Sequence, residues 1–165
     1  MADPNVLSPA AWEFEFPEAG LKGLRAGARA GAQDLGLSVY ELAPGGAVSP
    51  YHEHAANEEL LVVLSGSPSI RTPDGVRQLE AGAVVSFLPG PGGAHRVFNG
   101  SDAPAKVLLL ATNRYPEVAR HGDTGASLVL FADGSGDLYP PGSAADSLEW
   151  MRRAMVAGAQ ADSSQ

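Results

Sequence analysis

Apolar and polar residues alternate over short stretches through the middle of the chain, and turn-forming residues separate these stretches. Such alternation is typical of strands with one buried face. Strands are predicted over Leu35–Leu42, Val48–His54, Glu58–Leu64, Ser69–Thr72, Val76–Leu79, Ala83–Leu88, Ala94–Phe98 and Lys106–Thr112. Nothing between them has the length and period of a helix, so the pattern indicates an all-β fold, an antiparallel sandwich or barrel. The apolar positions predicted to form its core are Val39, Leu42, Val63, Phe87, Val97, Phe98, Leu108 and Leu110.

The N-terminal end is predicted to form an arm. A short strand with Trp12, Phe14 and Phe16 on one face is expected, because aromatic and acidic residues alternate there. Residues 20–33, rich in Gly, Ala and Arg, are predicted to be a loop. We therefore expect residues 1–34 to pack on the barrel as an N-terminal strand arm.

The C-terminal end has weaker patterns. One more strand is predicted over Ser127–Phe131, a loop over Asp133–Asp137 and a short helix over Leu148–Met155, whose apolar side chains share one face. A chain of 165 residues fits one domain. The barrel is expected over residues 35–121, with residues 122–165 as a C-terminal extension.

Charge and composition exclude several classes of function. The chain has 11 Lys and Arg against 19 Asp and Glu, a net charge of −8, which disfavours nucleic-acid binding because phosphate contacts need positive charge. It has no cysteine, so disulfides, thiol nucleophiles and thiolate ligands are excluded. Neither a secretory signal nor an apolar run long enough to cross a bilayer is visible, so we expect a cytoplasmic protein that does not bind membranes.

Three of the four histidines fall in two of the predicted strands. His52 and His54 stand two residues apart, so their imidazoles face the same side of a strand, and His95 lies in a later strand with Val97 and Asn99 on its face. A His-x-His pair alone commonly means solvated histidines. Three imidazoles and a carboxylate from a neighbouring strand, by contrast, suit one divalent transition metal, namely Zn, Fe, Mn, Ni or Cu.

Neighbouring residues are predicted to point away from this site. Tyr51, Glu53 and Arg96 have the opposite parity, and His121 has no partner at ligand spacing, which predicts a surface residue. Metal-binding imidazoles normally donate their second N–H to a carboxylate or carbonyl. The candidates for that partner are Glu53, Asn57 and Glu58.

The histidine pair stands in a longer pattern that resembles the first signature motif of the cupin superfamily. That motif runs Gly, five residues, His-x-His, three or four residues, Glu, six residues and Gly. The chain meets every spacing with Gly46, His52, His54, Glu59 and Gly66.

The segment around His95 resembles the second cupin motif, which runs Gly, five residues, Pro-x-Gly, two residues, His, three residues and Asn. Six residues separate Gly82 from Pro89 here, and the stretch from Pro89 to His95 is longer than the family's turn. The spacing from His95 to Asn99 is intact. The departures therefore concern the shape of the loop and not the imidazole.

The resemblance covers residues 35–121 and implies a double-stranded β-helix, a jelly-roll barrel that holds one divalent metal. The ligands that it implies are His52, His54, Glu59 and His95. Glu58 competes with Glu59 for the carboxylate position, and the six-residue gap to Gly66 favours Glu59. Asn99 is expected to form the turn at the strand end. Within the superfamily, the chain looks most like small bacterial single-domain cupins of unassigned activity.

The resemblance allows two main functions and a third. The first is a metalloenzyme that acts on a small polar oxygenated molecule, with the metal as Lewis acid, in an isomerase, lyase or dioxygenase reaction; Tyr51, Glu53 and Glu58 are weak candidates for proton transfer. The second is a metal-dependent module that binds or senses a small molecule, and the third is a storage protein.

Cupins commonly pair, so we expect a homodimer in which the arm or the C-terminal helix covers a barrel edge; packing within one chain is the alternative.

Overall fold

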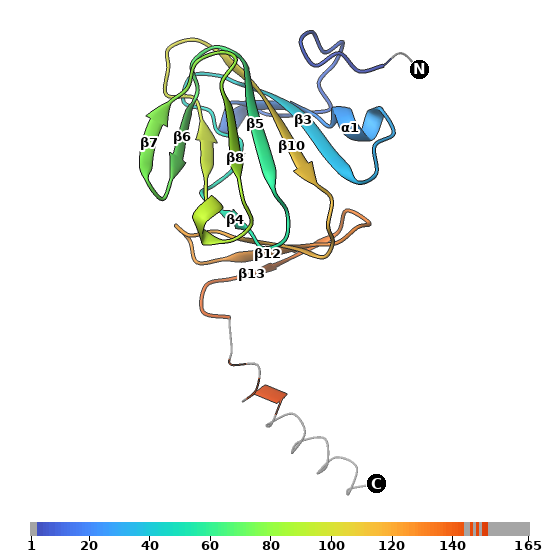
Figure 1. The fold of residues 1–165 in the computed structure, drawn as a ribbon, viewed down its shortest axis with the longest axis vertical. Helices are drawn as coiled ribbons and strands as arrows, with labels where there is room; N and C mark the ends of the chain where they lie inside the picture. Colours follow the sequence, from blue (N-terminus) through green and yellow to red (C-terminus); the bar gives the residue numbers. More distant parts are fainter. Residues whose placement is uncertain (1–2, 144–145, 147, 149, 152–165) are drawn as a thin grey trace, which may run out of the picture.

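Antiparallel sheets dominate the computed structural model, which describes residues 3–143, 146, 148, 150 and 151 (Figure 1). The largest sheet has six strands, in the order β1-β2-β3-β10-β5-β8. Their bounds are β1 Phe14–Phe16, β2 Leu21–Leu24, β3 Leu35–Leu42, β10 Ala105–Thr112, β5 Glu59–Ser65 and β8 Val84–Phe87. The predicted all-β jelly roll is confirmed.

Two smaller sheets complete the barrel. A three-stranded sheet has the order β7-β6-β9, with β7 Gly75–Gln78, β6 Ser69–Thr72 and β9 Arg96–Phe98. A four-stranded sheet has the order β13-β12-β11-β4, with β13 Gly136–Tyr139, β12 Ser127–Leu130, β11 Glu117–Arg120 and β4 Glu53–His54. In Figure 1, β12 and β13 run across the lower end of the barrel, close to β4.

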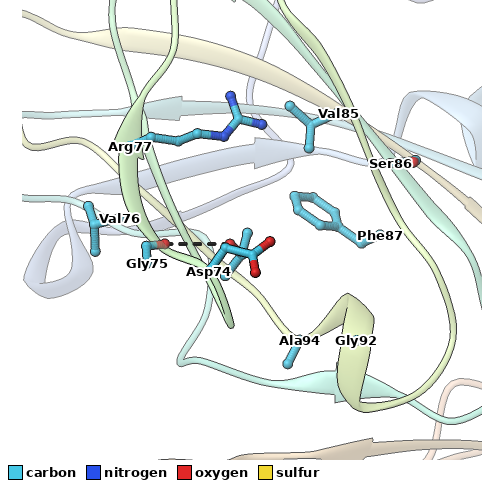
Figure 2. A pocket seen from close by; sticks show the side chains of 10 residues that line it. Asp74, Gly75, Val76, Arg77, Val85, Ser86, Phe87, Gly92 and Ala94 are labelled. Carbon is cyan, nitrogen blue, oxygen red and sulfur yellow. Dashed lines mark hydrogen bonds between the residues drawn. The ribbon is translucent and has the colours of Figure 1, made fainter.

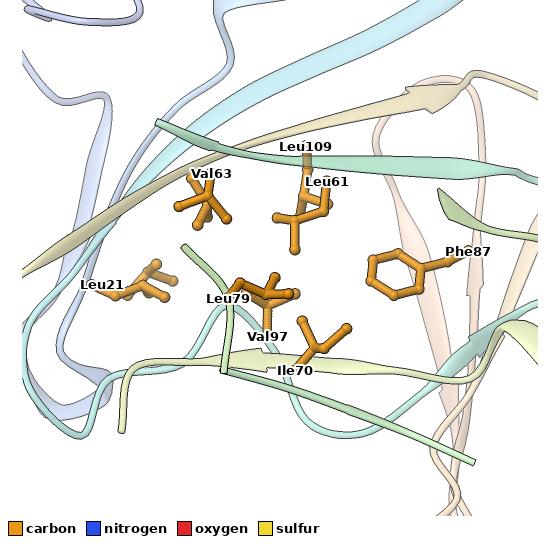
Figure 3. Packing of buried hydrophobic residues seen from close by; sticks show 10 residues of the cluster. Leu21, Leu61, Val63, Ile70, Leu79, Phe87, Val97 and Leu109 are labelled. Carbon is orange, nitrogen blue, oxygen red and sulfur yellow. The ribbon is translucent and has the colours of Figure 1, made fainter. Parts of the chain in front are cut away.

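Apolar side chains from the facing sheets fill the interior. In Figure 3, Leu61, Val63 and Leu109 point toward Ile70 and Val97 of the opposite wall. Each of these five side chains is at most 8% exposed. Of the predicted core residues, Val39, Leu42, Val63, Phe87, Val97 and Leu108 are buried, whereas Phe98 and Leu110 are partly exposed.

Two glycines of the first motif allow close approaches between segments. Gly66 directly follows β5 and has a φ of +77°, a backbone conformation that costs glycine little. A Cβ at this position would lie 2.7 Å from the Ala105 Cα. Gly46 packs directly on the backbone of Gly20, where a Cβ would overlap it. At both positions, the neighbouring backbone leaves room for glycine only.

The N-terminal arm is more regular than predicted. The expectation of a loop over residues 20–33 is wrong, because β2 joins β1 to β3 and helix α1, Ala26–Arg29, follows. Gly23 lies opposite Phe14, and any side chain at Gly23 would overlap the Phe14 ring. The glycine that reads as a loop signal therefore makes room for an aromatic ring in a sheet.

The C-terminal segment also forms sheet where a loop is predicted. β12 matches the predicted strand Ser127–Phe131 closely, but β13 overlaps the predicted loop Asp133–Asp137, and β11 carried no prediction. Leu148, Trp150 and Met151 have helical backbone, and the rest of the predicted helix Leu148–Met155 lies outside the described residues. Within the described part of the chain, none of the helices has the length and apolar character needed to cross a bilayer.

Short 3-10 helices join several strands. The first, η1 at Pro17–Ala19, connects β1 to β2. The second, η2 at Pro91–Gly93, occupies the long turn of the second motif. Gly90, just before η2, donates its N–H to the His54 carbonyl at 2.7 Å, which ties this turn to β4.

Candidate functional site

His52 and His95 are joined directly through their backbones. The predicted strand Val48–His54 is regular only at Glu53–His54, but an isolated bridge pairs His52 with His95. Their N–H groups donate to each other's carbonyls at 3.0 and 2.8 Å. This bridge brings the imidazoles of the two motifs together, with ring centroids 4.8 Å apart.

Backbone carbonyls orient two of the imidazoles. His52 Nδ1 lies 2.9 Å from the Pro50 carbonyl oxygen, and His95 Nδ1 lies 2.9 Å from the Gly93 carbonyl oxygen. A carbonyl only accepts, so each Nδ1 carries the proton and donates it. Each Nε2 is therefore left with a free lone pair, the form of imidazole that binds a metal ion.

The Nε2 atoms converge on the carboxylate of Glu59, the first residue of β5. Glu59 Oε2 lies 3.2 Å from His54 Nε2 and 3.0 Å from His95 Nε2, yet it is buried and has no hydrogen bond of normal geometry. His52 Nε2 and His54 Nε2 are 3.0 Å apart. Two nitrogens at that separation can both bond one zinc ion at roughly 2.1 Å.

The donor atoms of the first motif form a compact group that could hold a metal ion. One ligand atom each from His52, His54 and Glu59 lies within 4.8 Å of the others. His95 stands beside this group through its contact with Glu59, and its ring is buried to 1% exposure. Glu58 is exposed, so the carboxylate beside the imidazoles is that of Glu59.

Burial and neighbouring charge set the protonation of the group. Burial lowers the pKa of His52 to about 4. Burial also opposes protonation of His54, but Glu59 and Glu117 outweigh it and raise the His54 pKa. Burial raises the pKa of Glu59, but the contacts with His54 and His95 outweigh burial and lower this pKa to about 2. At neutral pH the group thus contains an ionised carboxylate and a neutral His52, the states that metal binding requires.

Glu117 is a buried carboxylate that carried no prediction. It lies on β11, is 2% exposed and accepts an N–H from Ala55 at 2.9 Å as well as a hydrogen bond from Asn57. Its Oε1 stands 3.6 Å from His54 Nδ1, which has no hydrogen-bond partner of its own. Asn57, one of the three predicted partners, therefore acts on Glu117 and not on an imidazole.

His121 lies beside the group, contrary to the prediction of a surface residue. It follows β11, its ring centroid is 5.7 Å from that of His52, and its Nδ1 is buried without a partner. Burial lowers its pKa. This proximity results from the pairing of β11 with β4, which joins segments distant in the chain. No short-range pattern in the sequence signals it.

A cavity of about 500 Å³ reaches the group from the end covered by the β11–β12 turn. Polar residues in its lining are Tyr51, His52, Glu53, Arg120, His121 and Ser127. Glu53 pairs with Arg120 at 3.1 Å, and Tyr51 lies under the Arg71 guanidinium at 4.1 Å from the ring centroid. Both residues thus have partners outside the imidazole group, as their parity predicts.

A second cavity, of about 270 Å³, lies at the gap between β7 and β8 (Figure 2). Phe87 points into this gap and also stacks on His95, with ring centroids 3.7 Å apart and planes 8° apart. The ring packs one side of the His95 imidazole with apolar surface. Arg96, the residue after His95, instead lies over Phe98 at 5.3 Å.

Asn99 closes the second motif. It is fully buried and donates to the carbonyls of Leu42 and Ala103 at 3.0 and 2.8 Å, while its Oδ1 accepts from Ser101. These bonds fix the turn between β9 and β10, and the residue has the turn-forming role that its motif implies.

Comparisons with known proteins agree with this geometry. A family model described as a cupin domain matches residues 38–111, which contain all four candidate ligands. Residues 38–111 form a cupin domain. No curated protein matches it in a sequence search.

Solved structures resemble this cupin over most of its length. A sugar phosphate isomerase of the cupin superfamily from Silicibacter pomeroyi is 26% identical, with a TM-score of 0.71 over 78% of this chain and 82% of that one. A proposed sugar phosphate isomerase from Acidithiobacillus ferrooxidans is 22% identical, with a TM-score of 0.68 over 75% and 78%. The polyketide cyclase RemF from Streptomyces resistomycificus is 24% identical, with a TM-score of 0.51 over 59% and 69%. The last two share the fold.

Proposed function

We propose that this cupin is a metal-dependent isomerase of a small molecule that carries neighbouring hydroxyl and carbonyl oxygens. Its ligands would be His52, His54, Glu59 and His95. The observation that supports this proposal is the buried Glu59 oxygen, which lies 3.0 and 3.2 Å from two imidazole nitrogens without a normal hydrogen bond. Lone pairs that face each other at such distances without donors between them are what a cation would satisfy.

The donor set suits a divalent transition metal. His52, His54, Glu59 and His95 would hold such an ion and would leave it accessible to substrate oxygens. When bound, such an ion supplies Lewis-acid chemistry, because it polarises a carbonyl oxygen and stabilises negative charge that develops on it. An isomerase is favoured over a lyase or a dioxygenase by the similarity to the Silicibacter pomeroyi protein.

The chain's own residues prepare the site for this chemistry. The Pro50 and Gly93 carbonyls hold the Nδ1 protons of two imidazoles, so both Nε2 atoms face the site without rotating. The Phe87 ring covers His95 and excludes water from one side of it. A dry, fixed site strengthens each electrostatic contact with the substrate.

A metal-dependent binding module is the second candidate function. One observation favours it: the carboxylate in the cavity lining, that of Glu53, is already paired with Arg120 and is not free to act as a base. A module of this kind would bind its ligand through the metal without converting it.

The experiment combines metal analysis with a substrate panel. Protein purified without added metal is analysed for its elements, then loaded with Mn, Fe, Co, Ni or Zn and tested on aldoses, ketoses, hydroxy acids and β-dicarbonyls. We expect interconversion of at least one hydroxy-carbonyl pair, and His95→Ala to lower kcat/KM by at least about 100-fold. The matched control is Arg96→Ala, the next residue along, which faces away from the site.

Three results would contradict the proposal in different ways. Failure of the folded protein to bind any of these metals would overturn the metal site. Metal-dependent affinity without product would favour the binding module. Activity that persists in metal-free protein would remove the metal from the reaction.

A further inference from the structure

The cavity of about 500 Å³ borders one of the four candidate ligands and limits what kind of molecule can approach it from that side. Its lining includes His52, whereas the lining of the cavity beside β7 and β8 includes none of the four candidate ligands. Small-molecule sites commonly have volumes of roughly 300–1,000 Å³. A substrate that reaches the metal site through this cavity therefore rests against its walls.

The charged side chains in the lining neutralise each other. They are Arg120 and Glu53, whose Nη1 and Oε1 atoms are 3.1 Å apart. Arg71 stands just outside, over Tyr51, and forms two hydrogen bonds with Asp123, at 2.8 and 2.9 Å. The one arginine in the lining, Arg120, is thus already paired with a carboxylate.

An unpaired phosphate would be poorly placed here. A phosphate is normally bound by arginine, lysine or a row of backbone N–H groups, because a charge that loses its water without a partner is costly. Apart from the paired ions, the cavity presents imidazole, hydroxyl, proline, alanine and glycine surface. That surface suits hydroxyl and carbonyl groups.

His121 is positioned to contact such a group. His121 belongs to the cavity lining, its ring centroid is 5.7 Å from that of the His52 ring, and its Nδ1 is buried without a hydrogen-bond partner. Tyr51 packs against Gly122, where a Cβ would meet the Tyr51 ring at 3.2 Å, and this contact holds the turn that carries His121. A neutral imidazole offers one donor and one acceptor, which match a hydroxyl group.

We infer that this cavity receives the uncharged end of the substrate, that His121 contacts a hydroxyl group there, and that the enzyme acts on unphosphorylated hydroxy-carbonyl compounds. This inference rests on the proposed isomerase function and narrows its substrate. It separates this cupin from the Silicibacter pomeroyi relative, whose name specifies a sugar phosphate.

The first test compares matched substrates on the full, metal-loaded chain. The pairs are aldoses and ketoses with and without a terminal phosphate, such as mannose and mannose 6-phosphate. We expect kcat/KM to be at least about tenfold higher for the unphosphorylated member of a pair. Preference for the phosphorylated member would overturn the inference and leave the isomerase standing. Turnover of neither member in any pair would overturn both.

The second test changes the charge of the cavity. Glu53→Gln leaves Arg120 without its carboxylate, so we expect selectivity to shift toward the phosphorylated member by about tenfold. Glu13→Gln frees Arg25, which does not line the cavity, in the same way and should leave selectivity unchanged. Metal content is measured in both variants. Equal selectivity in the two variants, at full metal content, would overturn the inference.

The third test concerns His121. His121→Ala should raise KM for the unphosphorylated substrate by about tenfold at unchanged metal content, because one hydrogen bond to the substrate is lost. His121→Gln, which keeps a donor and an acceptor, should recover part of the loss. An unchanged KM in the alanine variant would remove His121 from the substrate site.

Discussion

Strand β5 carries Leu61 and Val63 toward one end of the barrel interior and Glu59 toward the other. All three residues have the same parity, so they face the same side of the sheet. Leu61 and Val63 are at most 1% exposed and pack among apolar side chains, whereas Glu59 contacts two imidazoles. One strand thus serves both an apolar core and a polar site.

Strand β9 and the bridge before it repeat this division. Val97 lies in the core at 1% exposure, and His95, two residues earlier, faces the imidazole group. The apolar end stabilises the barrel by removing surface from water. The polar end keeps buried nitrogens and oxygens without full hydrogen bonding, which is costly to a folded protein. The apolar end therefore supplies the stability that holds the polar end open for a ligand.

The largest effect should come from substitutions at the two ends of β5. Leu61→Ala removes a fully buried side chain and should lower the free energy of unfolding by about 2–5 kcal/mol while the stabilisation on adding metal persists. Glu59→Gln should abolish that stabilisation, which reaches about 4 kcal/mol when metal exceeds its Kd 1,000-fold. Chemical denaturation with and without metal measures both.

The same two variants can contradict this division of β5 into an apolar and a polar end. If the folded Leu61→Ala variant is no longer stabilised by added metal, the apolar and polar ends of β5 do not act independently. If Glu59→Gln keeps the full response, the carboxylate is not a ligand.

A smaller effect is expected from the carboxylate behind His54. Glu117→Gln weakens the negative charge that stands 3.6 Å from His54 Nδ1, and metal affinity should fall by about 10–100-fold. Calorimetric titration measures it. Glu58→Gln is the matched control, because that carboxylate is exposed and should change affinity by less than about twofold. Equal affinities in the two variants would make Glu117 a purely structural residue.

The smallest effect concerns pH and separates the two histidines of the first motif. A proton and a metal ion compete for the same nitrogen. Because the His54 pKa is raised, its protonation begins at a higher pH than in a free imidazole, so affinity should fall as pH decreases through neutrality. The His52 pKa, about 4, keeps that residue out of this range.

Titration calorimetry of metal binding between about pH 8 and pH 6 measures this competition. Below the His54 pKa, the slope should approach about tenfold in Kd per pH unit, as for one displaced proton. A steeper change of Kd with pH, as for two displaced protons, would mean that His52 titrates as well. A flat profile would contradict the raised pKa of His54.

Much of the fold follows from local pattern. The predicted bounds Leu35–Leu42 and Ser69–Thr72 match β3 and β6, because alternation there coincides with a buried face. The missed strands β2, β11 and β13 are short and contain or border residues that read as turns, such as Gly23 and Gly136. Their pairing with neighbours, and not their composition, makes them strands.

Local sequence pattern predicted the strands of the barrel and placed His52 and His54 on one face, because side-chain parity is a property of neighbouring residues. The resemblance to the cupin motifs implied Glu59 and His95 as further ligands. Only the tertiary structure placed Glu117 behind His54 and His121 beside His52. Both belong to or follow β11, which reaches β4 across more than sixty positions, at Ala119↔His54. No local pattern encodes that contact, since it depends on how a distant strand folds across the end of the barrel.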